Sequence, residues 1–173
     1  MNNGSGWVLE NIESLRADIS KYKPFSGGSY IELDDKIKNK KCCINPKNDD
    51  QECFKWAILA GKYHKEIKSN PERINNLRLF ENKINWSMLK YPVNNDMINN
   101  FEKANDIPIN IYELDINNDD VKIIYNHKII SNNKIINLLL IENDNNSHYV
   151  YIKSLGALIR NGTHTLLPCD KCL

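Results

Sequence analysis

The stretch NDDQECFKWAILAGKYHKEI, residues 48–67, decides how the rest of the chain is interpreted. Its first three residues, Asn-Asp-Asp, are types that cap helices. Behind them Phe54, Ala57 and Ile58 recur at helical spacing, and Gly61 continues the same face. We therefore expect a helix from about Glu52 to Ile67 that packs closely through this face. Cys53 then lies in the first turn of that helix.

Outward from this helix, the pattern changes once along the chain. Helical spacing also occurs over residues 7–22, from Pro71 towards Phe80, and over 95–104. The polar, lysine-rich residues 30–48 predict an extended or irregular segment. From residue 107 onward, apolar and polar residues alternate over 107–114, 121–130, 135–141 and 148–153, with Asn/Asp turns between them. Helices followed by strands predict an α+β fold, with a helical N-terminal half packed on an antiparallel sheet.

Composition and length narrow the class of protein. The chain has 173 residues and a net charge of +1, which fits one domain with its own core. No segment approaches the roughly 18 apolar residues that a membrane helix needs, and a near-neutral chain lacks the basic field of a non-specific nucleic-acid binder. The 27 Asn and 23 Ile share A/T-rich codons, so we attribute their excess to genome bias. We expect a monomer that binds neither membrane nor nucleic acid.

The cysteines indicate the compartment and one domain boundary. There are five, Cys42, Cys43, Cys53, Cys169 and Cys172, and the first residues lack the layout of a signal peptide. An odd number of cysteines, two of them adjacent, argues against a disulfide scaffold and for a reducing compartment, the cytoplasm or nucleus. The terminal Cys-x-x-Cys is only half of a zinc ligand set. We therefore expect a domain over 1–160 without metal or cofactor, followed by a linker and a truncated zinc-finger module over 161–173.

Cys53 and His148 are the candidate catalytic pair. The N-terminus of a helix favours the thiolate form of a cysteine, and its N–H groups suit a developing oxyanion. His148 opens the last predicted strand, where a base is held rigidly across from a nucleophile. A cysteine at a helix start followed by a histidine on a strand is the papain-like arrangement. Cys42 and Cys43, in the irregular segment, are assigned no role.

Four stretches carry a family resemblance: GSGWVLENIESL (4–15), INPKNDDQECFKWAILA (44–60), INLLLIENDNNSHYVYIKSL (136–155) and PCDKC (168–172). Together they resemble a cysteine-peptidase region in polyproteins of Polinton-type DNA transposons, where a zinc-finger module follows. The region is also similar to herpesviral large-tegument deubiquitinases and, more distantly, to the ovarian-tumour class, in which an Asp precedes the nucleophile by three residues, as Asp50 precedes Cys53. The resemblance implies a papain-like cysteine peptidase fold and cofactor-free hydrolysis after the C-terminal glycine of ubiquitin.

The residue that orients the histidine is open at this stage. Ovarian-tumour enzymes place it two residues after the His, where this chain has Val150. Tegument-type enzymes use an Asp two residues from the His, and Asn146 stands two residues before His148. Asn146 is therefore the candidate, through its side-chain carbonyl. Ser154 lies on the same face of the strand, but about 20 Å from His148, which is too far to orient the imidazole.

The side chain that assists the oxyanion is open as well. Asn45, Asn48 and Gln51 precede Cys53 at plausible distances, and we favour Asn45. Bulky Phe54, Trp56 and Tyr149 flank the two catalytic positions, which favours a substrate with a glycine tail such as ubiquitin. The leading hypothesis is a deubiquitinase acting on ubiquitin or its chains. The alternatives are a peptidase that processes the polyprotein of a mobile element, and a catalytically inactive module that binds ubiquitin or another protein.

Overall fold

The structure is a computed structural model that describes residues 30–115, 120–143 and 146–160. The predicted helix over 7–22 and the tail with Cys169 and Cys172 lie outside the described residues.

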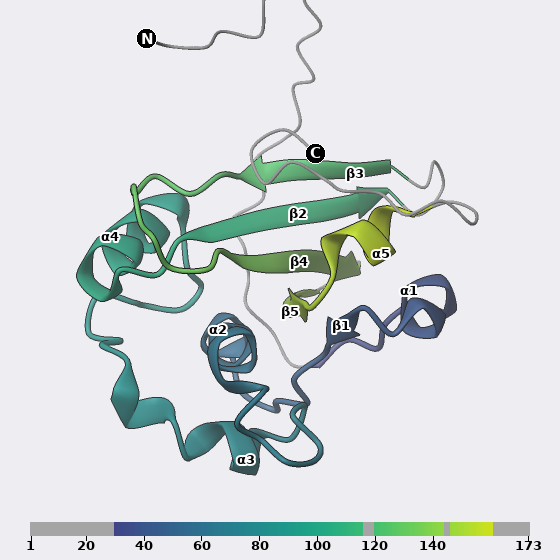
Figure 1. Cartoon of the computed structure of the whole chain (residues 1–173), viewed down its shortest axis with the longest axis horizontal. Coiled ribbons are helices and arrows are strands. Elements are labelled where there is room, and N and C mark those ends of the chain that lie inside the picture. Colours follow the sequence, from purple (N-terminus) through teal and green to yellow (C-terminus); the bar gives the residue numbers. More distant parts are fainter. Residues whose placement is uncertain (1–29, 116–119, 144–145, 161–173) are drawn as a thin grey trace, which may run out of the picture.

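A five-stranded mixed sheet forms the centre of the molecule (Figure 1). Its strands are β1 (Cys43–Ile44), β2 (Ile109–Asp115), β3 (Asp120–Tyr125), β4 (Ile136–Asn143) and β5 (Asn146–Ile152), in the order β1-β5-β4-β2-β3. The predicted strands are found, but the expectation of a purely antiparallel sheet is wrong, because β2 and β4 are parallel. The reason is that β3 folds back to the beginning of β2, and residues 126–135 carry the chain across before β4 starts.

Five α-helices accompany the sheet in the described part of the chain: α1 (Asp35–Lys40), α2 (Cys53–Tyr63), α3 (Ile74–Arg78), α4 (Asn95–Asn105) and α5 (Leu155–Ile159). The helix expected at 52–67 is α2, and the one expected at 95–104 is α4. The helix expected from Pro71 to Phe80 is shorter, and a 3₁₀ helix, Glu81–Lys83, follows it. Residues 30–48 were expected to be extended or irregular; they contain the short strand β1, and also the helix α1, which was not expected. None of the described helices has the length and apolar character to cross a membrane.

The start of α2 is fixed by Asp50. One oxygen of its carboxylate accepts the backbone N–H of Glu52 at 2.8 Å, and both oxygens lie within hydrogen-bond distance of the Trp56 indole nitrogen, at 3.0 and 2.9 Å. Glu52, at the N-cap, makes no capping bond with its own side chain. Asp50 thus closes a turn before the helix through the N–H of Glu52. It also links this turn to Trp56, the fourth residue of the helix, so that the helix begins at Cys53.

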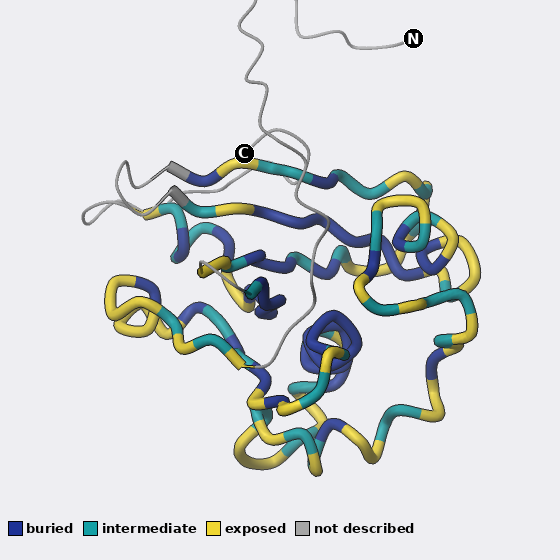
Figure 2. Tube along the Cα trace, turned by 180° about the vertical axis from the view of Figure 1, so that it is seen from behind, coloured by how far each residue is buried: buried dark blue, intermediate teal, exposed yellow. Residues whose placement is uncertain are grey.

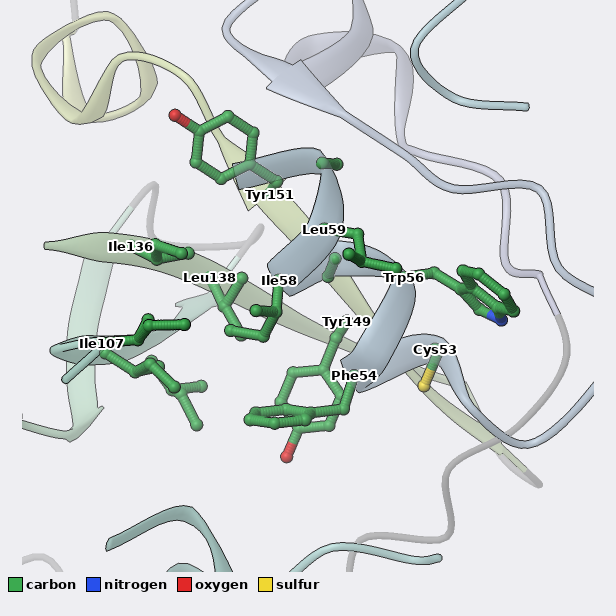
Figure 3. Packing of buried hydrophobic residues seen from close by; sticks show 14 of the residues in the cluster. Cys53, Phe54, Trp56, Ile58, Leu59, Ile107, Ile136, Leu138, Tyr149 and Tyr151 are labelled. Atoms are coloured by element: carbon green, nitrogen blue, oxygen red, sulfur yellow. The ribbon is translucent and has the colours of Figure 1, made fainter. Parts of the chain in front are cut away.

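Helices cover both faces of the sheet. On one face α2 and α4 enclose the larger core, where α2 is buried along nearly its whole length (Figure 2). Figure 3 shows its side chains packing against Leu138 of β4 and Tyr149 of β5. On the opposite face α1 and α5 cover a second core that includes Val150 and Ile152 of β5. Because side chains alternate along β5, its two faces belong to different cores.

Gly61 is where α2 approaches the sheet most closely. A Cβ atom at this position would lie 2.6 Å from Cγ2 of Ile136 and 3.1 Å from Cδ2 of Tyr151. The Ile136 methyl is held on a β-branched side chain in a strand, so it cannot turn aside cheaply. The expectation that Gly61 faces the packed side of the helix is confirmed.

We predict that Gly61→Ala destabilises the protein by roughly 1–2 kcal/mol, because overpacking outweighs the helix propensity gained with alanine. Urea unfolding measures the change. Lys62→Ala, at the exposed neighbouring position, is the control and should change stability by less than about 0.5 kcal/mol. A Gly61→Ala protein as stable as the wild type would show that the helix and sheet are not in this contact.

Candidate active site

Cys53 is the first residue of α2, as the sequence predicts, and its side chain is buried with 1% exposed. The next residue, Phe54, packs edge to face on Tyr149 of β5, with ring centroids 5.3 Å apart. Figure 3 shows Cys53 at the beginning of the helix, one residue before Phe54. The thiol therefore lies at the start of α2.

His148 is the third residue of β5 and is fully buried. It pairs with Ile141 of β4, which packs in the second core, so strand alternation turns its imidazole away from the face that α2 covers. Its Nε2 lies 2.7 Å from Oδ1 of Asn45. The ring of Tyr30 covers it edge to face, with centroids 6.0 Å apart.

The hydrogen bond to Asn45 defines the state of the imidazole. Nδ2 of Asn45 donates to the carbonyl of Ile31 at 2.8 Å, which fixes Oδ1 as the atom that faces His148. Because Oδ1 only accepts, Nε2 of His148 carries the proton and donates it. Nδ1 is then the unprotonated nitrogen, and it is buried without a hydrogen-bond partner among the described residues. This nitrogen has the lone pair that a general base uses.

Asn45 and Asn146 therefore differ from their predicted roles. The sequence analysis placed Asn45 at the oxyanion and Asn146 beside the imidazole, whereas the structure pairs the imidazole with Asn45. Asn146 is the first residue of β5 and pairs with Asn143 of β4. The reason is the pairing of β1 with β5, which brings the residue after β1 beside His148. The sequence signal for this pairing, a two-residue strand in a polar segment, is too weak to recognise.

The other oxyanion candidates are engaged elsewhere or exposed. Nδ2 of Asn48 donates to the backbone carbonyl and the carboxylate of Asp50, and Gln51 is exposed.

Sequence reasoning missed Tyr91, which packs against the core cluster that contains Cys53. Burial is the main cause that raises the pKa of Tyr91, with the nearby acidic groups adding to it, so its hydroxyl stays neutral. That hydroxyl is buried and finds no hydrogen-bond partner among the described residues.

The thiol and the imidazole are not hydrogen-bonded to each other in this structure, since Nε2 is taken by Asn45 and Nδ1 has no such partner. The imidazole lies at the edge of the sheet and is turned towards the face of the second core, whereas the thiol lies at the start of α2 on the opposite face. β1 pairs only with Tyr151 and Ile152, so within the described strands β5 is the edge at His148. Residues 46–52 lead round this edge from Asn45, which holds the imidazole, to Cys53 at the start of α2.

Within the described ranges, no group of three or more His, Cys, Asp or Glu side chains is arranged to hold a metal ion. No protein-family model, no curated protein and no solved structure matches this chain. The arrangement of Cys53, His148 and Asn45 is therefore interpreted from its own geometry.

Burial also determines how His148 titrates. Removal from water penalises the imidazolium and lowers the pKa of His148 from 6.5 to about 4. In the unfolded chain His148 becomes protonated below about pH 6.5, whereas in the folded protein it stays neutral until about pH 4. The stability that the neutral imidazole contributes is therefore complete above pH 6.5 and is lost as the pH falls towards 4.

We predict that the free energy of unfolding falls by about 3 kcal/mol from this residue alone between pH 6.5 and pH 4, at about 1.4 kcal/mol per pKa unit. Urea unfolding across this range should show a steeper pH dependence for the wild type than for His148→Gln, which cannot titrate. His64 and His127 are present in both proteins, so their contributions cancel. Parallel pH profiles would contradict a buried, neutral His148.

Proposed function

We propose that the protein is a cysteine-dependent hydrolase with a papain-like catalytic arrangement, in which Cys53 is the nucleophile and His148 the general base. Asn45 is the positioning residue. The observation that carries the proposal is the buried hydrogen bond between Asn45 and Nε2 of His148. It leaves Nδ1 unprotonated on an imidazole at the edge of the sheet.

The chemistry follows from the protonation states. With a pKa of about 4, His148 is neutral at physiological pH and its Nδ1 can accept a proton. Nδ1 accepts the thiol proton as the sulfur attacks the substrate carbonyl, while the carbonyl of Asn45 stabilises the imidazolium that forms. The imidazolium then protonates the leaving amine, and water hydrolyses the thioester.

The oxyanion is stabilised by the N-terminus of α2. The first turn of a helix presents backbone N–H groups that have no partner within the helix, and the helix dipole adds positive potential there. α2 has no acidic residue in its first turn, so no side-chain charge of its own opposes an anion at Cys53. These donors are part of the backbone and need no reorganisation during the reaction.

The proposed substrate is the C-terminal glycine of ubiquitin. Its support is the resemblance of the stretches around Cys53 and His148 to deubiquitinase-like peptidases, together with a closed site in which thiol and imidazole are both almost completely buried. The bulky neighbours no longer contribute to this argument. Phe54, Trp56 and Tyr149 are core residues with at most 1% exposed, and none lines an open channel. A substrate reaches the thiol only if the residues that cover it move aside.

We predict that ubiquitin carrying a C-terminal electrophile labels the protein covalently, and that Cys53→Ala abolishes the labelling because the attacking sulfur is lost. Mass spectrometry of the adduct locates the modified cysteine. Cys43→Ser is the matched control and should label like the wild type. Failure of ubiquitin to label, combined with cleavage of the polyprotein junctions of a mobile element, would replace ubiquitin with a self-derived substrate.

A further prediction ranks the two carboxamides near His148. Asn45→Ala should slow labelling roughly tenfold or more, because the imidazole loses the group that fixes its tautomer, whereas Asn146→Ala should change the rate by less than about twofold. His148→Ala should slow it by about 100-fold or more. Imidazole ¹⁵N spectra should show the Nε2–H tautomer in the wild type and a mixture in Asn45→Ala. A larger loss of labelling rate in Asn146→Ala than in Asn45→Ala would mean that Asn146, and not Asn45, orients the imidazole.

A further inference from the structure

Cys42 and Cys43 form a contact that the proposed site does not use. Their Sγ atoms lie 3.6 Å apart and share a hydrogen bond. Consecutive side chains of an extended strand point to opposite faces, which would keep two neighbouring sulfurs apart. The chain departs from extended geometry just before this pair, where Lys41 adopts a left-handed conformation with φ of 49°. The two thiols are thus in contact where the chain leaves this turn and enters β1, whose first residue is Cys43.

The two thiols have different surroundings. Cys42 is 2% exposed and packs in the second core, whereas Cys43 is half-buried and lines a cavity of about 500 Å³. Lys41 and Lys153 line the same cavity, together with Asn45. A small oxidant in this cavity therefore meets Cys43 directly and Cys42 just beneath it.

One of the two sulfurs is activated by the other. The hydrogen bond from Cys43 lowers the pKa of Cys42 to about 7 against the effect of burial, and the charges of Lys40 and Lys153 add to the lowering. The pKa of Cys43 is raised, because its thiol donates to Cys42 and is partly removed from water. A thiolate beside a thiol is the combination in which the second sulfur can resolve an oxidised first one.

We propose that Cys42 and Cys43 are a redox modification site, in which hydrogen peroxide closes a disulfide between the two neighbouring residues. The Cys42 thiolate attacks one peroxide oxygen, so that an S–O bond forms, the O–O bond breaks and hydroxide leaves to become water. The Cys43 sulfur then attacks the sulfenic sulfur, the S–S bond forms, and the S–O bond breaks to release a second water with the proton of Cys43. Two thiols and one peroxide thus give one disulfide and two waters.

The expected consequence is a displacement of β1. Closing the bond draws the sulfurs from 3.6 Å to about 2.05 Å, which reorients the peptide between them. The carbonyl of Cys42 accepts the backbone N–H groups of Lys153 and Ser154 at 2.7 and 3.3 Å, and Cys43 pairs with Ile152 of β5. Asn45, two residues later, holds His148. Oxidation is therefore expected to disturb the imidazole, and its effect on catalysis rests on the proposed function.

Trypsin separates the relevant cysteines. Cleavage after Lys41 and Lys47 yields the fragment CCINPK, residues 42–47, and Cys53 falls in the next fragment, residues 48–55. After treatment of the whole protein with hydrogen peroxide and then iodoacetamide, fragment 42–47 should be two hydrogens lighter and carry no alkyl group. Dithiothreitol should restore its full alkylation, since a strained disulfide is easily reduced. Cys43→Ser should give no such species.

Two outcomes would overturn the site: two alkyl groups on fragment 42–47 after oxidation, or a disulfide that joins this fragment to 48–55. Imidazole ¹⁵N spectra test the coupling without requiring activity, and the His148 signals should shift on oxidation in the wild type but not in Cys43→Ser. Unchanged signals despite a confirmed disulfide would overturn the link to the imidazole. Because both readouts are independent of turnover, they can fail or succeed whether or not ubiquitin is the substrate.

Discussion

The hydrogen bond between Asn45 and His148 is the interaction on which the candidate site depends. It joins the end of β1 to the beginning of β5 and occupies Nε2 of an imidazole that is otherwise cut off from water. A buried polar group left without a partner costs about 1–3 kcal/mol, so the bond favours the pairing of β1 with β5 as well as one tautomer of the ring. The same contact that stabilises the sheet edge thus leaves Nδ1 with the lone pair that the proposed reaction would use.

The position of the thiol depends on a separate set of contacts around α2. Asp50 closes the turn before the helix and holds the indole of Trp56 in its second turn, which sets the start of the helix at Cys53. Gly61 then lets the helix lie close against β4 and β5. Thiol and imidazole are therefore held by two structural units, the helix on one face of the sheet and the edge of β5, and residues 46–52 connect Asn45 at that edge to the helix.

Helices with a strong local pattern could be predicted from the sequence. Strand pairing and contacts between residues far apart in the chain could not. The helical spacing around Cys53 and over 95–104 predicts α2 and α4 to within a few residues at most ends. The parallel pairing of β2 with β4 was missed because alternation carries no information on strand direction. β1 was missed because it has two residues, and Asn45 was assigned to the oxyanion because its contact with His148 spans a separation of 103 residues.

The most direct test of the account is the rate at which iodoacetamide alkylates Cys53, followed by mass spectrometry of the fragment 48–55. Burial of the thiol slows the reaction in every variant, so the informative comparison is between the wild type and His148→Gln, which keeps a side chain of similar size but cannot accept the thiol proton. If His148 is the base for Cys53, alkylation at neutral pH should be roughly tenfold or more faster in the wild type. Equal rates in the two proteins would mean that the imidazole does not serve this thiol.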